Sequence, residues 1–298
     1  LKQYAKEKEL QIVGDIPIYV ALDSADVWSH PELFQLDEEN LTPLKVSGVP
    51  PDAFSEDGQL WGNPLYDWEK MEQTDFAWWR SRMKASAKLY DAVRIDHFIG
   101  VVQYYAIPYG AVTAKDGEWE KGPGKKLTDA LDEAAGETKI IAEDLGIFVP
   151  EVKELLEETG YPGMKIIEFA FSGDRFNEHL PHMYSPNSVV YGGTHDNETL
   201  VGYFKPEARQ WWELQYIADY MGVSHQHEVV DKVLKTAYAS VASVVIFQAQ
   251  DVLKLDSWAR MNTPGTVGNN WRWRMKPGEL TQDHINRLSW LVDTFGRF

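Results

Sequence analysis

Six short apolar runs, with helical patterns between several of them, constrain the fold of this chain more than any other feature. The runs are rich in Val, Ile and Phe and mostly lack strict alternation with polar residues, which is typical of buried parallel strands. They cover residues 12–20, 92–95, 140–142, 164–171, 189–191 and 242–248. Helical spacing of apolar residues occurs at 75–90, 128–135 and 151–159. This alternation predicts an α/β fold built on a parallel sheet.

The length of the chain, 298 residues, suits a TIM-type (β/α)8 barrel, which takes about 250 residues. Because the sequence shows six strands rather than eight, we expect an incomplete barrel that lacks the first two strands. A single catalytic barrel domain is expected over residues 1–298, with an insertion or lid subdomain after the first strand present, at about 21–74. A late loop at about 256–277 and a closing helix at about 281–298 complete it.

Acidic residues follow one predicted strand after another. They are Asp23 and Asp26 after the first run, Asp96 after the second, Glu143 and Asp144 after the third, then Asp174, Asp196 and Asp251. The carboxyl ends of barrel strands share one face, where active sites are built. Asp is also common in the loops and helix caps that follow strands. Because several of these acids directly adjoin apolar runs, we favour the interpretation that they form a functional site.

The second run ends in a basic and an acidic residue with one residue between them. Side chains two apart on a strand point the same way, so Arg94 and Asp96 share a face. A guanidinium beside a carboxylate favours the ionised form that a nucleophile requires. A structural ion pair explains the same pattern equally well, and the motif alone leaves both interpretations open.

Two further motifs add carboxylates to the same expected face. A partly buried Glu143 next to other acids would have a raised pKa, as a general acid requires. Asp196 is flanked by His195 and Asn197, an imidazole and an amide able to bind hydroxyl groups. Three such carboxylates match glycosidic bond cleavage, and they also match a magnesium site. Arg94, together with the neighbouring histidines, argues against a metal ion because these side chains would crowd it.

Composition excludes several classes of function. Acidic residues outnumber basic ones by 46 to 29, and no basic block is present, so nucleic acid is not an expected partner. The absence of cysteine excludes disulfides, zinc thiolate sites, iron–sulfur clusters and cysteine nucleophiles. No apolar stretch approaches the length of a membrane span, so we expect a cytoplasmic protein with no membrane partner. The 12 Trp and 14 Tyr residues suit the faces of sugar rings as well as ordinary cores.

Seven motifs in order resemble one known family. They occupy residues 14–20, 48–55, 58–64, 94–98, 142–146, 193–197 and 261–265. Together they resemble the 4-α-glucanotransferases, the amylomaltases or disproportionating enzymes of the α-amylase superfamily, over essentially the whole chain. Members of that family have a substantial N-terminal region, so the resemblance implies that this chain is truncated at its N-terminus.

The resemblance implies a role for each carboxylate. Asp96 would be the nucleophile, Glu143 the acid/base, and Asp196 the carboxylate that grips ring hydroxyls of the sugar being cleaved. The implied reaction is double displacement with retention, in which α-1,4-glucan segments pass between maltooligosaccharides. No cofactor and no metal ion are expected, and the sequence makes no prediction of oligomeric state.

The resemblance also implies a set of substrate-binding residues. Arg94 would keep Asp96 charged, His97 and His195 would bind hydroxyls, and Asp15 lies where the superfamily keeps an Asp on an earlier strand. Trp61 with Asp52 and Phe54 would belong to a loop that closes over the glucan, and Asn262 would contact substrate from the late loop. An aromatic lid at 50–68 would then exclude water from the intermediate.

The sequence departs from the family pattern at one position near the expected nucleophile. Ile99 stands where the family commonly has Arg, which removes a cation near the nucleophile.

Two alternative functions are also compatible with these residues. An α-glucan hydrolase would use the same carboxylates in a wetter site. An inactive, truncated glucan-binding fragment would keep the acids and aromatic residues without turnover.

Overall fold

The computed structural model describes residues 1–52 and 55–298. The chain forms two compact units, Leu1–Gly163 and Met164–Phe298, and each is described here by itself. The expectation of one barrel domain over the whole chain stays a prediction.

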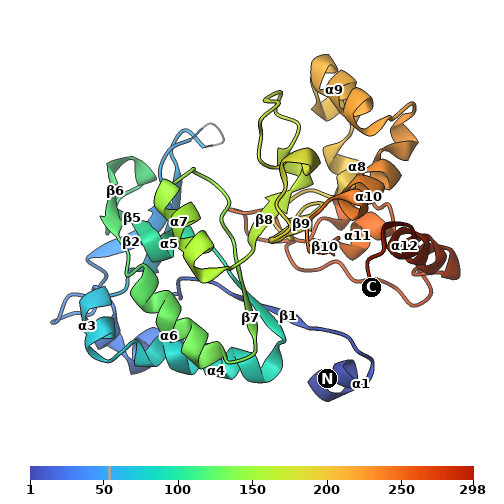
Figure 1. The fold of residues 1–298 in the computed structure, drawn as a ribbon. Coiled ribbons are helices and arrows are strands. Elements are labelled where there is room, and N and C mark those ends of the chain that lie inside the picture. The colour runs from blue at the N-terminus through green and yellow to red at the C-terminus, as the bar shows by residue number, and fades with distance from the viewer. Residues whose placement is uncertain (53–54) are drawn as a thin grey trace. The chain divides into compact units, whose positions relative to one another are not determined.

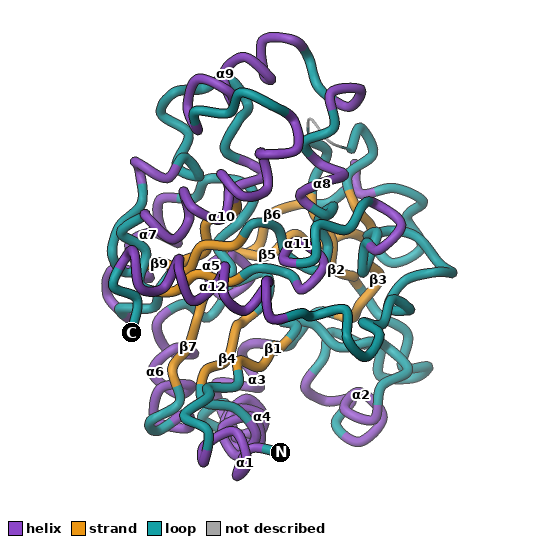
Figure 2. Tube along the Cα trace, turned by 90° about the vertical axis from the view of Figure 1, so that its right-hand side faces the viewer, coloured by secondary structure: helices purple, strands orange, loops and turns teal. Residues whose placement is uncertain are grey.

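A three-stranded parallel sheet lies at the centre of the first unit. Its strands β1 (Val13–Ile16), β4 (Ala92–Ile95) and β7 (Lys139–Ala142) run side by side in the order β1-β4-β7 (Figure 2). All three were predicted, but β1 is shorter than the apolar run because Pro17 has no backbone N–H to continue the ladder. Ile95 pairs with Ile16 on one side and Ala142 on the other. The residues that follow the three strands therefore emerge at one edge.

The helices of the first unit contribute buried side chains such as Met83 and Leu127 to its apolar core. They are α1 (Lys2–Glu7), α2 (Ala25–Ser29), α3 (Trp68–Gln73), α4 (Ala77–Leu89), α5 (Ile99–Val102), α6 (Lys125–Ala135) and α7 (Pro150–Thr159). The longest, α4, packs against α6 (Figure 1). The sequence predicted α4 and α7 closely, but α6 begins three residues earlier than expected, after Gly124. A proline at its start and a left-handed Gly160 at its end bound α7 as predicted.

A second, antiparallel sheet in the first unit was not predicted. Its strand order is β3 (Gln59–Pro64), β2 (Lys45–Val49), β5 (Gln103–Pro108) and β6 (Glu118–Lys121). The expected insertion at 21–74 therefore shares its sheet with residues 103–121. Strands β3 and β6 are largely exposed, so they lack the apolar run that signals a buried strand. Lys45 joins the strands through ion pairs to Glu118, at 2.7 Å, and to Glu120.

The second unit holds the three remaining predicted strands. They are β8 (Gly163–Ile166), β9 (Ser188–Tyr191) and β10 (Val244–Ile246), in the order β10-β9-β8, with β9 and β10 parallel. The prediction that the strand at β8 continues to residue 171 was wrong, because Ile167–Phe169 forms a 3-10 turn. That turn places Glu168 inside the unit rather than along a strand edge.

The helices of the second unit pack around these strands. They are α8 (Leu200–Tyr203), α9 (Trp211–Met221), α10 (Val229–Ala239), α11 (Ala249–Val252) and α12 (Gln282–Phe295). The closing helix was predicted and is α12, which packs on α10. Its Leu291 is buried, whereas Ile285 is exposed. Arg297 fastens the end of α12 by donating to the carbonyl oxygens of Tyr238, Ser240 and Ala242 at 2.7–2.9 Å.

No helix in the described part of the chain has the length and apolar character needed to cross a membrane.

Trp79 of α4 provides a test of the first unit's core. Its side chain is 1% exposed, so Trp79→Ala should lower the free energy of unfolding by about 3–5 kcal/mol through lost burial and a residual cavity. Trp28→Ala is the matched control, because Trp28 is 85% exposed, and it should change stability by less than about 0.5 kcal/mol. Denaturant unfolding of both variants measures the difference. Equal losses in the two variants would contradict this packing.

Candidate active site

A buried arginine organises the carboxylates of the first unit. The Arg94 side chain is 9% exposed, and its Nε and Nη2 donate to the two oxygens of Asp15 at 2.9 Å each. The same Nη2 donates to Oδ1 of Asp96 at 2.8 Å. Strand register explains the first pair, because Asp15 of β1 lies opposite Arg94 of β4. The predicted contact between Arg94 and Asp96 is confirmed, and Asp15 joins it.

Glu143 is held against the residue that follows Asp96. Backbone N–H groups of His97 and Leu145 donate to its two carboxyl oxygens at 2.6 and 3.0 Å. The Glu143 backbone N–H donates to Ile95 O, and its carbonyl accepts from Phe98 N. These bonds follow from the pairing of β4 with β7, so the sheet itself brings the two acids to one place.

Burial gives Glu143 a different acidity from that of an exposed carboxyl. The side chain is buried, and desolvation together with the negative charge of Asp96 raises its pKa to about 7. The positive charge of Arg94 and the two backbone donors oppose this rise in pKa. A carboxyl with a pKa near neutrality is partly protonated at pH 7, which is the state that a general acid needs. The sequence predicted this raised pKa.

Asp144, the next acid in the chain, does not join Glu143. Its carboxylate lies over Gly163, where a Cβ added to the glycine would approach Oδ2 to 2.4 Å. Of the two neighbouring acids after β7, therefore, Glu143 faces Arg94 and Asp144 packs on the first residue of β8.

Aromatic rings surround His97. Its ring meets Trp61 edge-on with 4.8 Å between centroids, and Tyr19 lies 6.3 Å away. Burial lowers the pKa of His97 to about 4, so its imidazole is neutral at pH 7. Its backbone is in the left-handed region at φ 53°, which turns the chain sharply after Asp96. The structure thus places two predicted substrate-binding residues, His97 and Trp61, together, and it adds Tyr19, which the sequence did not single out.

Of the other two residues expected in the closing loop, one lies within the described residues. Asp52 is exposed, and its Oδ1 accepts from Ser55 N at 2.7 Å. Phe54 lies outside the described residues. The roles of both in glucan binding stay predictions.

The second unit brings together His195, Asp196 and Asn262. Asn262 Nδ2 donates to Asp196 Oδ1 at 2.6 Å, and His195 Nε2 lies 3.4 Å from Oδ2 of the same carboxylate. The backbone N–H of Asn262 donates to His195 O at 3.1 Å. Asn197 is occupied otherwise, since its Oδ1 accepts from Thr194 N and Oγ1. The late loop therefore contacts Asp196, a contact that was not predicted, and the expected contact of Asn262 with the substrate stays a prediction.

Two residues that the sequence did not predict complete this arrangement. Arg260 Nη2 donates to Asp196 O at 2.7 Å, and its Nε donates to Asn262 O at 2.9 Å. Trp271 places its ring 5.1 Å from that of His195. Arg260 directly precedes the motif at 261–265, but a link to a backbone carbonyl 64 residues away leaves no local pattern that would reveal it.

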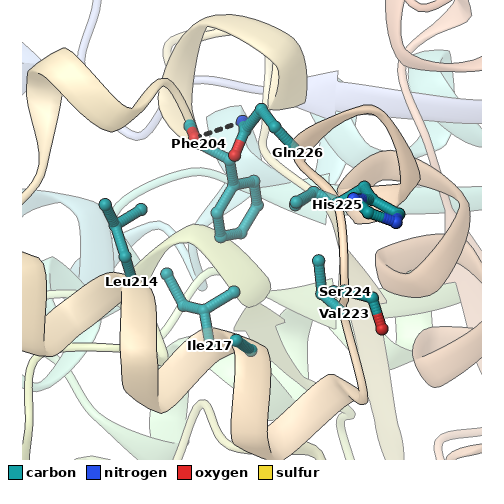
Figure 3. A pocket seen from close by; sticks show the side chains of 9 residues that line it. Phe204, Leu214, Ile217, Val223, Ser224, His225 and Gln226 are labelled. Atoms are coloured by element: carbon teal, nitrogen blue, oxygen red, sulfur yellow. Dashed lines mark hydrogen bonds between the residues drawn. The ribbon is translucent and has the colours of Figure 1, made fainter.

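Other features of the described residues do not extend the site. Among residues 1–52 and 55–298, no group of three or more His, Cys, Asp or Glu side chains is arranged to hold a metal ion. A mainly apolar cavity of about 170 Å³ in the second unit is lined by residues such as Phe204, Ile217 and Val223 (Figure 3). None of the predicted site residues lines it.

Comparison with known proteins shows which family the chain belongs to. The model of the Glyco_hydro_77 family, described as 4-alpha-glucanotransferase, matches residues 1–281. The chain belongs to this 4-α-glucanotransferase family. It is similar to a 4-alpha-glucanotransferase of Clostridium butyricum, with 48% identity over 297 residues, which are 100% of this chain and 61% of that protein.

Solved structures of this glucanotransferase family and of a wider group share the fold. Amylomaltase from Streptococcus agalactiae in complex with acarbose has a TM-score of 0.94 and 43% identity, covering 99% of this chain and 59% of that one. An α-amylase from Geobacillus thermoleovorans has a TM-score of 0.57 at 9% identity, covering 99% of this chain and 60% of that one. The second likeness is one of fold alone, and it agrees with an α/β chain of the (β/α)8 type.

The chain spans between about half and three fifths of the length of the glucanotransferases that it matches, 61% for the protein of Clostridium butyricum and 48% for one of Oryza sativa. The match confirms the family that the seven motifs indicated.

Removing Arg94 tests the electrostatics of the first unit. Because Arg94 lowers the pKa of Glu143, Arg94→Met should raise that pKa by about one unit or more above its value near 7. Carbon NMR of labelled glutamate, assigned with Glu143→Gln, follows the titration. Arg80→Met is the control, because Arg80 pairs with Asp75 and Glu133 instead. An unchanged or lower pKa in Arg94→Met would show that Arg94 does not act on Glu143.

Proposed function

We propose that this chain carries the catalytic residues of a 4-α-glucanotransferase, which moves α-1,4-glucan segments between maltooligosaccharides with retention of configuration. One observation carries the proposal. At the ends of adjacent strands, Asp96 is bonded to a buried guanidinium, and Glu143 has a pKa of about 7 because of burial and the charge of Asp96. Two carboxyls in such different environments match the nucleophile and the acid/base of a retaining mechanism.

In the first half of the reaction, Glu143 donates its proton to the glycosidic oxygen while Asp96 attacks the anomeric carbon. The C–O bond to the departing fragment breaks, and that fragment leaves with a hydroxyl group. Arg94 keeps a positive charge 2.8 Å from Asp96, which supports the anionic nucleophile. Asp15 shares that guanidinium and fixes its orientation with two hydrogen bonds.

In the second half, ionised Glu143 removes a proton from the 4-hydroxyl of an acceptor glucan. The acceptor oxygen attacks the anomeric carbon and displaces Asp96, which forms a new α-1,4 bond and restores both carboxyls. The proposed reaction needs neither a cofactor nor a metal ion. Glu143 supplies and takes up the proton, and Asp96 forms and releases the bond to the anomeric carbon.

The second unit would supply contacts to the sugar being cleaved. Asp196, held by Asn262 and by Arg260, would grip ring hydroxyls, with His195 beside it. We further propose that the six strands β1, β4, β7, β8, β9 and β10 belong to a fold of the (β/α)8 type. The match to an amylomaltase structure over 99% of this chain supports this arrangement. Trp61 and its loop would close over the glucan and exclude water.

Maltooligosaccharides and α-1,4-glucans are the proposed donors and acceptors, and neither nucleic acid nor a membrane is a proposed partner. A cytoplasmic location is likewise proposed on the composition of the chain, which is rich in acidic residues and free of cysteine.

Maltotriose alone provides the test of this function. Transfer between two maltotriose molecules yields longer chains together with glucose, which chromatography of the products resolves over time. Asp96→Asn should lower the rate by at least about 10³-fold with the fold intact, because it removes the nucleophile. Asp23→Asn, a change at an exposed acid, should retain the wild-type rate.

Three outcomes would contradict the proposal. Glucose and maltose without longer chains would indicate an α-glucan hydrolase. Glucan binding without turnover would indicate a binding protein. Substantial residual transfer in Asp96→Asn would exclude this residue as the nucleophile.

A further inference from the structure

Glu168 is a buried acid that neither the predicted site nor the proposed mechanism uses. It lies in the 3-10 turn directly after β8, and its side chain is 2% exposed. Among the described residues, its buried Oε1 has no hydrogen-bond partner. A buried carboxylate without a hydrogen-bond partner destabilises the folded protein, so the presence of Glu168 at this position calls for an explanation.

The position of the carboxyl group points to the loop that carries Asp196. A Cβ added to Gly193 would lie 2.6 Å from Glu168 Oε1 and 2.9 Å from the Cβ of Asn197. The carboxyl group therefore packs against Gly193 at the start of the turn 193–197, where any larger residue would force Glu168 or Asn197 to shift. The backbone N–H of Glu168 also donates to Gly192 O at 3.2 Å.

The main chain of Glu168 is fixed as well. Its carbonyl oxygen accepts a hydrogen bond from the hydroxyl of Tyr203. The ring of Tyr203 in turn lies 3.5 Å from the guanidinium of Arg209. The carboxyl group thus extends from a hydrogen-bonded backbone and contacts the turn. A change in its size or charge would therefore shift the turn.

The charges around Glu168 favour its neutral form. Burial raises its pKa well above the usual value, and the charges of Asp251 and Glu198 act in the same direction. Arg260 and Arg209 oppose this rise in pKa but do not cancel it. Arg260 is the same residue that donates to Asp196 O and to Asn262 O. A negative charge on Glu168 would attract the Arg260 guanidinium and so compete with its hydrogen bond to Asp196 O.

Asp251 is a second buried acid in the same unit, and its Oδ2, like Oε1 of Glu168, has no hydrogen-bond partner among the described residues. It is fully buried, and its Oδ1 accepts from the backbone N–H of Leu200 at 2.7 Å, at the start of α8. Glu168 has no such bond from its carboxyl group to a helix end. Its contacts are with the turn that presents His195 and Asp196.

We propose that Glu168 is a positioning residue, which supports the Gly193–Asn197 turn as a neutral carboxylic acid and so holds Asp196 in place for glucan binding. This inference rests on the proposed function, because it assigns Asp196 to the sugar. Glutamine has nearly the same shape as a neutral glutamic acid, whereas leucine has a similar size without polar atoms. The two substitutions therefore separate positioning by a neutral polar group from simple packing.

The first experiment tests the protonation state without any substrate. Thermal unfolding of the full-length protein and of its Glu168→Gln variant is followed between about pH 5 and pH 8. A folded-state pKa above the unfolded value means that the wild-type carboxyl weakens the folded state increasingly as pH rises. The melting temperature of Glu168→Gln relative to wild type should therefore increase with pH. Glu207→Gln, the same change at an exposed acid, should show no such trend, and a flat difference for Glu168→Gln would overturn the neutral form.

The second experiment tests positioning through glucan binding, with turnover removed by Glu143→Gln. Calorimetry with maltoheptaose should give an affinity for Glu143→Gln/Glu168→Gln within about twofold of Glu143→Gln alone. Glu143→Gln/Glu168→Leu should bind at least about tenfold more weakly. Equal affinities for the Gln and Leu variants would overturn the inference.

The two proposals fail in distinguishable ways. If the unsubstituted protein forms no longer chains from maltotriose but the binding contrast holds, the proposed transfer fails and Glu168 still positions a glucan-binding turn. If transfer is present but the binding contrast is missing, only the role of Glu168 is contradicted.

Discussion

The first unit's site depends on the burial of one guanidinium. A buried cation is costly without anionic partners, and Arg94 obtains them from Asp15 across the β1–β4 pair and from Asp96 further along its own strand. This pairing keeps a positive charge on one side of Asp96. Glu143, on the next strand, is far more buried than Asp96, and burial together with the charge of Asp96 raises its pKa to about 7. A single ion pair and the register of three short strands therefore place two neighbouring carboxyls in different environments, which retaining transfer requires.

The second unit uses a different physical means to fix a carboxylate. Asp196 is bonded through its side chain to Asn262 and through its backbone to Arg260. Around this group lie buried acids with raised pKa values, Glu168 and Asp251. In the proposed neutral form, Glu168 leaves Arg260 available to the turn. The charge state of the surrounding acids, rather than a direct ion pair, would thus decide how firmly Asp196 is held.

The parts that the sequence predicted well are those determined by local pattern. Strand β4 was predicted with its observed bounds because it is apolar and buried, and its two-residue spacing correctly placed Arg94 beside Asp96. The resemblance named Asp15 but not its partner, because register between strands 79 residues apart leaves no local signal. In the antiparallel sheet, the edge strands β3 and β6 were missed because they are exposed. The inner strands β2 and β5 are buried, but β2 mixes polar and apolar residues and forms no continuous apolar run. Glu168 was missed because its burial depends on a turn that ends the strand earlier than its apolar sequence suggests.

Trapping the covalent intermediate tests the central claim, that Asp96 is the nucleophile and Glu143 the acid/base, most directly. A glycosyl fluoride of maltose has a leaving group that needs no protonation, so Glu143→Gln should still form the intermediate but break it down slowly. Mass spectrometry of the digested protein should then find one maltosyl group on the peptide that contains Asp96. Modification of a different carboxylate, or direct release of product without any labelled peptide, would contradict the account.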